Sequence, residues 1–164
     1  MPMARTLGVD PGVRGAYVML GNGHPHVYTM PVRSGEVNYQ QVYADWKALA
    51  PELIVIENPV WMPKMSRASA GNFGLHIGTL RGMAFAMGCE FGTRLMYVAP
   101  QTWKKIVLVG TAKDKSAAIE WVSRAYPNIN LNVKNKPHDG IADATCIAEY
   151  GLRLYASAAS RKDQ

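Results

Sequence analysis

Residues 53–56, Leu-Ile-Val-Ile, form an unbroken apolar run near the middle of the chain, and Glu57 follows it directly. Such a run predicts a strand that is buried on both faces, as central parallel strands are. A carboxylate at the end of a buried strand needs a partner, because an unpaired charge is costly to bury. We therefore interpret Glu57 as a functional residue on a strand that lies inside a sheet.

Strand and helix patterns follow one another in a simple order around this run. Three strands come first, joined by tight turns as a meander. The later strands alternate with helices, which is typical of parallel pairing. The expected strands are Thr6–Asp10, 15–20, 25–30, 53–56 and Arg94–Val98, and the expected helices are Tyr39–Leu49, 72–87, 101–109, 116–126 and a last helix that opens within 136–144 and runs to 159.

The predicted fold class is therefore α/β. We expect a mixed five-stranded sheet, with three antiparallel strands and then parallel ones, flanked by helices on both faces. At 164 residues the chain is expected to form one domain over 1–159, with a frayed tail at 160–164. The polar stretch 128–136 predicts a mobile loop before the last helix.

Asp139 and Asp143 lie four residues apart where the last helix is expected to begin. At this spacing two residues share one helix face, with about 5–6 Å between their Cβ atoms. Two carboxylates there repel each other unless a cation lies between them. The residues around Asp143 are small or apolar, which favours a partner or a metal for this carboxylate. The structural alternative is an N-cap at Asp139 beside one solvated Asp143.

The charge balance points to a polyanionic partner. The chain carries 18 Lys and Arg against 12 Asp and Glu, a net charge of +6. A basic body around an acidic pocket suits an enzyme that acts on nucleic acid, although a generally basic protein is the alternative. No apolar run is long enough to span a membrane. Cys89 and Cys146 stand in apolar helical stretches, which indicates buried thiols in a reducing compartment, and we expect a cytoplasmic location.

Four acids form the candidate active site: Asp10 after the first strand, Glu57, Asp139 and Asp143. They would meet if the first and fourth strands are neighbours and the last helix crosses them. Oxygen ligands without a His or Cys cluster select Mg²⁺ or Mn²⁺ over zinc. Two such ions about 4 Å apart stabilise the attacking water and the leaving 3′-oxygen in phosphodiester hydrolysis. We therefore predict two Mg²⁺ ions per active site, with Mn²⁺ able to substitute.

Three short motifs occur in the order of a known family: Gly-Val-Asp-Pro-Gly at 8–12, Ile-Glu at 56–57 and Ala-Asp-Ala at 142–144. Together they resemble the RuvC-like Holliday junction resolvases of the ribonuclease H-like nuclease superfamily, with a closer likeness to phage-type members. The resemblance covers about residues 6–155. It implies a ribonuclease H-like fold and a homodimer that resolves four-way DNA junctions by paired nicks, in a bacterial or phage-infected cell.

The resemblance also implies roles for single residues. Asp10, Glu57 and Asp143 match the acids of the family directly. The remaining ligand of the family, an Asp or a His, often lies three residues before the last Asp, where this chain has Gly140. We assign the role to the adjacent Asp139, with His138 beside it as the alternative.

DNA contacts are expected from two regions. The loop before residue 72 mixes aromatic and basic side chains and resembles the part of the family that probes the junction centre, although a core-facing Trp61 is equally compatible. Lys104 and Lys115 resemble basic residues near the family's active site, while a solvated surface is the alternative for the lysines of this region. The helix with glycines at 74, 78 and 82 resembles the family's dimer helix. The expected DNA-binding residues are Trp61, Lys64, Arg67, Lys104, Lys105, Lys113 and Lys115.

Other functions remain open at this stage. A ribonuclease H-like nuclease could instead cut flaps, forks or RNA–DNA hybrids, because catalytic metals read only a phosphodiester. A non-catalytic junction-binding module is disfavoured, since a DNA binder gains nothing from clustered negative charge. An actin-like ATPase also begins with an Asp-x-Gly turn after a strand, but the chain has no second glycine-rich phosphate loop and no Walker pattern.

Overall fold

The computed structural model describes residues 4–21, 23–59, 66–111 and 116–160 of the 164-residue chain. Its main sheet has five strands in the order β3-β2-β1-β6-β7. They are β1 (Thr6–Asp10), β2 (Ala16–Leu20), β3 (His26–Thr29), β6 (Leu53–Glu57) and β7 (Arg94–Val98). The pairs β1–β2 and β2–β3 are antiparallel, whereas β1–β6 and β6–β7 are parallel. The predicted mixed sheet is confirmed, and the apolar run 53–56 lies in one of its inner strands.

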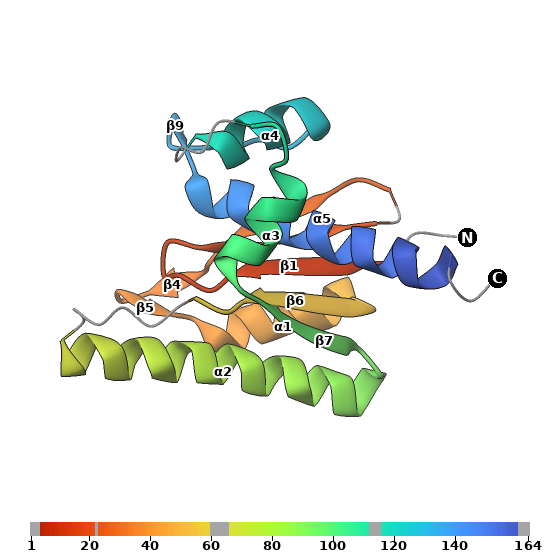
Figure 1. Cartoon of the computed structure of the whole chain (residues 1–164). Helices are drawn as coiled ribbons and strands as arrows, with labels where there is room; N and C mark the ends of the chain where they lie inside the picture. The colour runs from red at the N-terminus through yellow and green to blue at the C-terminus, as the bar shows by residue number, and fades with distance from the viewer. Residues whose placement is uncertain (1–3, 22, 60–65, 112–115, 161–164) are drawn as a thin grey trace.

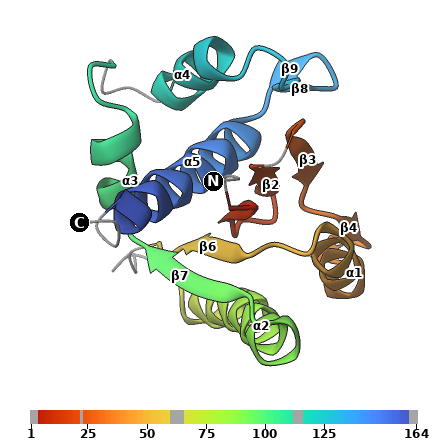
Figure 2. The same cartoon turned by 90° about the vertical axis from the view of Figure 1, so that its right-hand side faces the viewer.

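Helices cover both faces of this sheet (Figures 1 and 2). On one face lie α1 (Tyr39–Leu49) and α2 (Arg67–Phe91). On the other lie α3 (Pro100–Val107), α4 (Ala117–Ala125) and α5 (Asp139–Ser160). The expectation of helices on both faces is therefore confirmed. Among the described helices, none is both long and apolar enough to cross a membrane.

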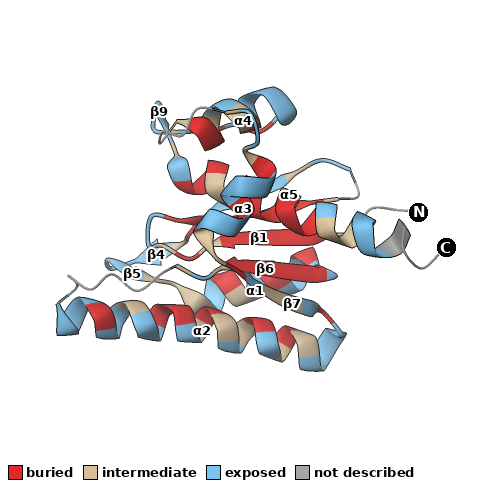
Figure 3. Cartoon of the chain, in the orientation of Figure 1, coloured by how far each residue is buried: buried red, intermediate tan, exposed pale blue. Residues whose placement is uncertain are grey.

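Alternate residues of the inner strands belong to two separate cores, because successive side chains of a strand point to opposite faces of the sheet. Both β1 and β6 are buried along most of their length (Figure 3). The core beneath α1 and α2 takes one set of strand residues: Leu7, Val9, Ile54 and Ile56. Leu53 and Val55 belong to the core beneath α5. By the same alternation, Asp10 and Glu57 lie on the α5 side of the sheet.

Glycines let α5 lie directly on β1. A Cβ on Gly8 of β1 would overlap backbone atoms of Ala144 and Ala148 in α5. A Cβ on Gly151 of α5 would lie 2.7 Å from the Thr6 side chain. Positions without a Cβ allow this close approach of two backbones. The first turns of α5 are thereby brought against the end of β1 that carries the candidate active-site acid.

The stretch predicted as a mobile loop, 128–136, contains a short hairpin, so that prediction is wrong. β8 (Asn132–Val133) and β9 (Lys136–Pro137) pair antiparallel. The two residues between them, Lys134 and Asn135, have φ angles of 50° and 61°. Two adjacent positive φ values are typical of the tight type I′ hairpin turn, which polar residues can adopt as well as a glycine pair. The polarity of the stretch therefore did not exclude regular hydrogen bonding.

A second short hairpin, β4 (Val32–Arg33) with β5 (Glu36–Val37), precedes α1 and has no counterpart in the predicted elements. The long helix α2 also exceeds its predicted range of 72–87. It begins after Ser66, whose side chain accepts a hydrogen bond from the Ser69 N–H at 3.1 Å. It ends at Gly92, which is left-handed with φ 71°. These two caps explain the extension at both ends.

Candidate active site

Asp10 and Glu57 stand at the ends of neighbouring parallel strands. Val9 of β1 pairs with Ile56 of β6, so the two acids follow as the next residues at one edge of the sheet. Asp10 opens the turn into β2, where the Gly12 N–H donates to its Oδ1 at 3.4 Å. The turn closes with a 2.8 Å hydrogen bond from the Gly15 N–H to the Gly12 carbonyl. Both carboxylates therefore project from rigid strand ends.

Asp143 approaches the same edge from α5 and interacts electrostatically with both strand acids. Burial and the negative charges of Asp143 and Glu57 raise the pKa of Asp10 to about 7. Burial, with the charges of Glu57 and Asp139, raises the pKa of Asp143 to about 6, against the opposing effect of Lys104. These shifts mean that Asp10, Glu57 and Asp143 lie within electrostatic reach of one another, and that Asp139 lies within reach of Asp143.

The donor set suits a hard divalent cation, since it offers carboxylate oxygens whose mutual repulsion a cation would relieve. The side chains in this structure are not spaced as the ligands of a bound metal ion would be. Across the described residues, no group of three or more His, Cys, Asp or Glu side chains is arranged to hold a metal ion. The chemistry of the site therefore fits Mg²⁺, while the assignment of each acid as a ligand stays a prediction.

The environment of the fourth predicted ligand differs between the two alternatives. The ring Nδ1 of His138 accepts a hydrogen bond from the Ile141 N–H at 3.2 Å and thereby caps α5. This hydrogen bond occupies the lone pair of Nδ1, and the same N–H also donates to the His138 carbonyl oxygen at 3.2 Å. Asp139 is exposed at the start of α5, and its charge contributes to the raised pKa of Asp143. The structural alternative of an Asp139 N-cap does not apply, because His138 has that position.

α3 supplies two side chains to the site. Nε1 of the buried Trp103 donates a 2.8 Å hydrogen bond to Oε1 of Glu57. Lys104 is exposed, lies over the Trp103 ring at 5.1 Å from its centroid, and lowers the pKa of both Asp10 and Asp143. Lys104 was predicted to lie near the active site. Trp103 was not, and its only signal in the sequence was its place next to that lysine.

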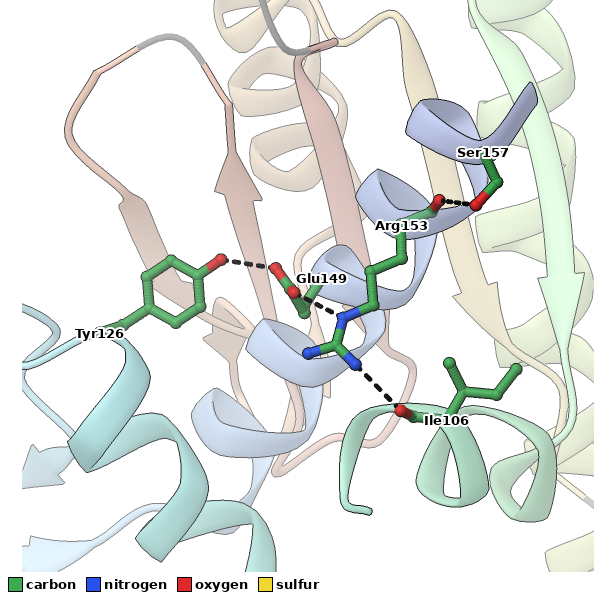
Figure 4. Close-up of polar contacts among 5 residues, drawn as sticks. All are labelled: Ile106, Tyr126, Glu149, Arg153 and Ser157. Carbon is green, nitrogen blue, oxygen red and sulfur yellow. Dashed lines mark hydrogen bonds and ion pairs between the residues drawn. The ribbon is translucent and has the colours of Figure 1, made fainter. Parts of the chain in front are cut away.

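A polar network holds α3 and the end of α4 against α5 (Figure 4). Glu149 of α5 accepts hydrogen bonds of 2.7 Å from both the Tyr126 hydroxyl and Nε of Arg153. The guanidinium of Arg153 also donates to the carbonyl oxygen of Ile106 in α3 at 3.0 Å. Charge-assisted hydrogen bonds of this kind are stronger than neutral ones. The network therefore fixes the helix that carries Trp103 and Lys104 relative to the helix that carries Asp143.

A pocket of about 1160 Å³ opens beside the acids, between α3, α4 and α5. Asp139 and Asp143 form part of its lining, and Lys104 and Lys105 face them from α3. The remaining lining is mostly small or apolar: Gln101, Leu108, Val109, Gly110, Thr111, Ala117, Ala118, Ile119 and Ala142. The pocket combines cationic side chains from α3 with anionic side chains from α5, as a site for a phosphodiester backbone with a bound cation would require.

The other predicted DNA contacts divide into two groups. Arg67 is the first residue of α2 and is exposed. Four of the predicted residues lie outside the part of the chain that the structure describes: Trp61, Lys64, Lys113 and Lys115. Lys104 and Lys105 are therefore the two predicted DNA contacts near the acids whose positions the structure describes.

The inner and outer faces of α2 have different roles. On the inner side, Arg81 donates a 2.7 Å hydrogen bond to Oδ1 of Asn58, the residue after Glu57, and stacks on the Tyr97 ring at 4.3 Å from its centroid. On the outer side, glycines 74, 78 and 82 are exposed, and a Cβ at any of them would meet nothing within 4 Å. The glycines are therefore not explained by packing within the protomer.

The sheet order, the helices on both faces and the acids at the ends of β1 and β6 define a ribonuclease H-like fold. RuvC of T. thermophilus, solved in complex with a Holliday junction substrate, matches with a TM-score of 0.64 and 19% identity over 93% of this chain and 94% of its own. A second Thermus thermophilus RuvC structure matches with a TM-score of 0.59 and 18% identity over 93% of this chain and 96% of its own.

Ydc2, the yeast mitochondrial Holliday junction resolvase, matches with a TM-score of 0.63 and 15% identity, over 94% of this chain and 80% of its own. The structural likeness to the RuvC-like resolvases, expected from the sequence, is thereby confirmed across nearly the whole chain. No protein-family model and no curated protein matches the sequence. At these identities the comparisons establish the fold, and the likeness to phage-type members stays a prediction.

Proposed function

We propose that this protein is a metal-dependent, structure-selective endonuclease that resolves four-way (Holliday) DNA junctions by paired phosphodiester hydrolysis. The observation that carries the proposal is the approach of Asp10, Glu57 and Asp143 from three different elements, with a raised pKa on Asp10 and on Asp143. Clustered, buried carboxylates of this kind lower the stability of the folded state unless they bind a cation. The same fold in a RuvC solved with a Holliday junction substrate supports the choice of DNA junctions.

Four carboxylates would hold two Mg²⁺ ions, for which Mn²⁺ can substitute: Asp10, Glu57, Asp139 and Asp143. Bound Mg²⁺ would supply the charge that stabilises an attacking water and a departing 3′-oxygen. The chain itself contributes the positioning, because strand ends and the first turns of α5 hold the acids with little freedom. Asp139 is preferred over His138, since the ring of His138 already caps α5 through Nδ1.

DNA binding is assigned to the basic residues around the site. Lys104 and Lys105 line the pocket beside the acids and would contact the phosphates next to the scissile bond. Arg67 at the start of α2 would contact the DNA backbone farther from the scissile bond. The proposal keeps the remaining predicted contacts, which lie outside the described residues: Trp61, Lys64, Lys113 and Lys115.

A homodimer is part of the proposal, since paired nicks require two active sites. The outer face of α2 carries an unusual combination of exposed glycines with Leu75, 71% exposed, and Phe85, 67% exposed. Three interior glycines cost a helix about 1 kcal/mol each relative to alanine. A second copy of α2 could approach closely over such a face and offset that cost by burying the two apolar side chains.

The main rival is a nuclease with the same site but another substrate, such as flaps, forks or RNA–DNA hybrids. A second rival is a non-catalytic junction-binding module. One experiment separates all three: labelled four-way junction, flap, fork, duplex and RNA–DNA hybrid are incubated with the protein and with Mg²⁺, Mn²⁺ or EDTA. Symmetric, metal-dependent nicking of the junction alone is the expected result. Cutting of another substrate would overturn the junction assignment, and tight junction binding without cutting would leave the binding module.

The same assay on Asp143→Asn tests the role of the acids. We expect this variant to bind the junction about as tightly as the wild type and to lose detectable cleavage, because it removes one charge from the proposed metal site without changing the shape of the side chain. Loss of junction binding together with cleavage would instead assign Asp143 to the fold.

A further inference from the structure

The indole of Trp103 contacts one oxygen of a candidate active-site carboxylate. Its Nε1 donates a 2.8 Å hydrogen bond to Oε1 of Glu57, and the whole Trp103 side chain is buried. An indole N–H is a donor only, and when buried it normally has a partner. With little competing water, a hydrogen bond to a carboxylate is stronger than one between neutral groups.

The topology of the sheet creates this contact. Glu57 of β6 is the register partner of Val98 in β7. α3 begins two residues after Val98, at Pro100, whose ring suits the first helical position. Trp103 therefore lies one turn into α3, above the end of β6, where it joins the core cluster beneath α5. Both partners are held by regular elements that pack in the same core.

We propose that Trp103 is a positioning residue for Glu57. Its N–H holds Oε1 and so selects the side-chain conformation in which Oε2 is offered to a divalent cation. Among the described residues, no hydrogen bond is made to Oε2 of Glu57. An anchored carboxylate loses less conformational freedom when it binds a cation, and partners of this kind orient metal ligands in many sites. This inference rests on the proposed function, because it concerns the affinity of the same acids for Mg²⁺.

A second buried tryptophan provides an internal comparison. Trp46 of α1 is also fully buried, in the core on the opposite face of the sheet. Its Nε1 has no hydrogen-bond partner among the described residues. The two indoles are therefore equally removed from water, and only one of them donates to a candidate metal ligand. A change that Mg²⁺ causes at the site should reach the Trp103 N–H and not the Trp46 N–H.

The first test compares Trp103→Phe with the wild type in the full chain. Phenylalanine retains an aromatic ring in the core but removes the N–H donor. We expect Mg²⁺ binding, measured by titration calorimetry, to weaken about 10- to 100-fold, as is typical when such a partner is lost. Junction binding in EDTA should stay unchanged. The matched control is Trp121→Phe, at a half-buried tryptophan of α4 whose ring packs at a tilt against that of Tyr126, and its Mg²⁺ affinity should equal that of the wild type.

The second test needs no substitution at Trp103 and covers the case in which Trp103→Phe does not fold. The indole ¹H–¹⁵N signals of the wild type are followed by NMR as Mg²⁺ is added. A shift of the Trp103 signal with the Trp46 signal unmoved is the expected result. A folded Trp103→Phe variant with wild-type Mg²⁺ affinity, or a Trp103 signal that does not respond while Mg²⁺ binds, would overturn the assignment. A wild type that binds no Mg²⁺ would overturn the proposed function, and this inference with it.

Discussion

Gly140 of α5 packs against the main-chain carbonyl of Arg14 in the turn between β1 and β2. A Cβ at position 140 would lie 2.7 Å from the Arg14 oxygen and 2.9 Å from the Cα of Gly15. Both neighbours are backbone atoms, so neither can rotate away as a side chain could. This is the position where the RuvC-like family often has its remaining acidic or histidine ligand. In this chain the contact leaves no room for a side chain at position 140, so the ligand role that we predict for Asp139 cannot be taken by a residue substituted there.

The contact predicts that Gly140→Asp destabilises the fold and does not add a ligand. An inserted side chain at a closed contact typically costs about 1–3 kcal/mol, and we expect a loss of at least that size in the free energy of unfolding. Urea unfolding in EDTA measures it. The control is Gly71→Ala, at an exposed position of α2 where a Cβ meets nothing within 4 Å, and it should leave stability equal or slightly higher. Equal stability of Gly140→Asp and wild type would contradict the prediction.

The raised pKa values of Asp10 and Asp143 predict how the stability of the metal-free protein depends on pH. Below about pH 4 both acids are protonated in the folded and the unfolded chain, so the folded state bears no cost. Between about pH 4 and the folded-state pKa values of about 6 and about 7, the unfolded chain has lost these protons whereas the folded chain retains them, and above these values the difference no longer grows. The free energy of unfolding contributed by these groups therefore falls over this window.

The measurement is urea unfolding in EDTA from pH 4 to pH 8, for the wild type and for Asp10→Asn. Each pKa unit corresponds to about 1.4 kcal/mol, so the wild type should lose at least about 1 kcal/mol more than the variant between the two ends of the range. Parallel curves for the two proteins would refute the electrostatic description of the site.

The exposed glycines of α2 predict a variant that separates folding from association. In Gly78→Gln the new side chain has open space within the protomer, so the fold should persist with a helix that is somewhat more stable. If two copies of α2 pack over this face, the same side chain prevents their close approach, and sedimentation should show a monomer. Ala48→Gln, at an exposed position of α1, is the matched control and should retain the dimer. A dimeric Gly78→Gln would exclude this face as the interface.

Lys105 is predicted to contact a DNA phosphate. Loss of one phosphate contact weakens binding uniformly across sequences and lowers the slope of log K against log salt by about one. Junction binding by Lys105→Ala, measured in EDTA over a range of salt concentrations, tests this. Lys47→Ala is the control, because Lys47 lies on α1 and pairs with Glu90 at 3.4 Å. An unchanged slope in Lys105→Ala would remove this residue from the DNA interface.

Several features of the fold could be predicted from local patterns. The run 53–56 indicated an inner parallel strand, and β6 occupies that place between β1 and β7. The three-strand meander and the alternation of later strands with helices followed from periods of hydrophobicity and from turn residues. The hairpin of β8 and β9 was missed, because its tight turn depends on positive φ angles at Lys134 and Asn135, and the types of these two residues do not by themselves indicate such angles.

The partners of the candidate site could not be predicted in the same way. The hydrogen bond between Trp103 and Glu57 joins residues 46 positions apart, and it depends on the register of β6 and β7. The cap formed by His138 and the closed contact at Gly140 depend on how α5 lies on β1. Sequence patterns within one helix or strand give no information on such distances between elements.

The sequence by itself determined the residue types: carboxylates at predicted strand and helix ends within a basic chain, a combination that suits a divalent cation and a polyanion whatever the detailed packing. Only the tertiary structure decided which side chains donate hydrogen bonds to these carboxylates or interact with them electrostatically. The helix α5 could approach β1 because glycines removed the side chains between two backbones, and this approach brought Asp143 within electrostatic reach of Asp10 and Glu57. The charge of a residue is fixed by its type. The repulsion between the acids, the hydrogen bond from Trp103 to Glu57 and the exclusion of a side chain at position 140 all depend on distances between elements, which the packing sets.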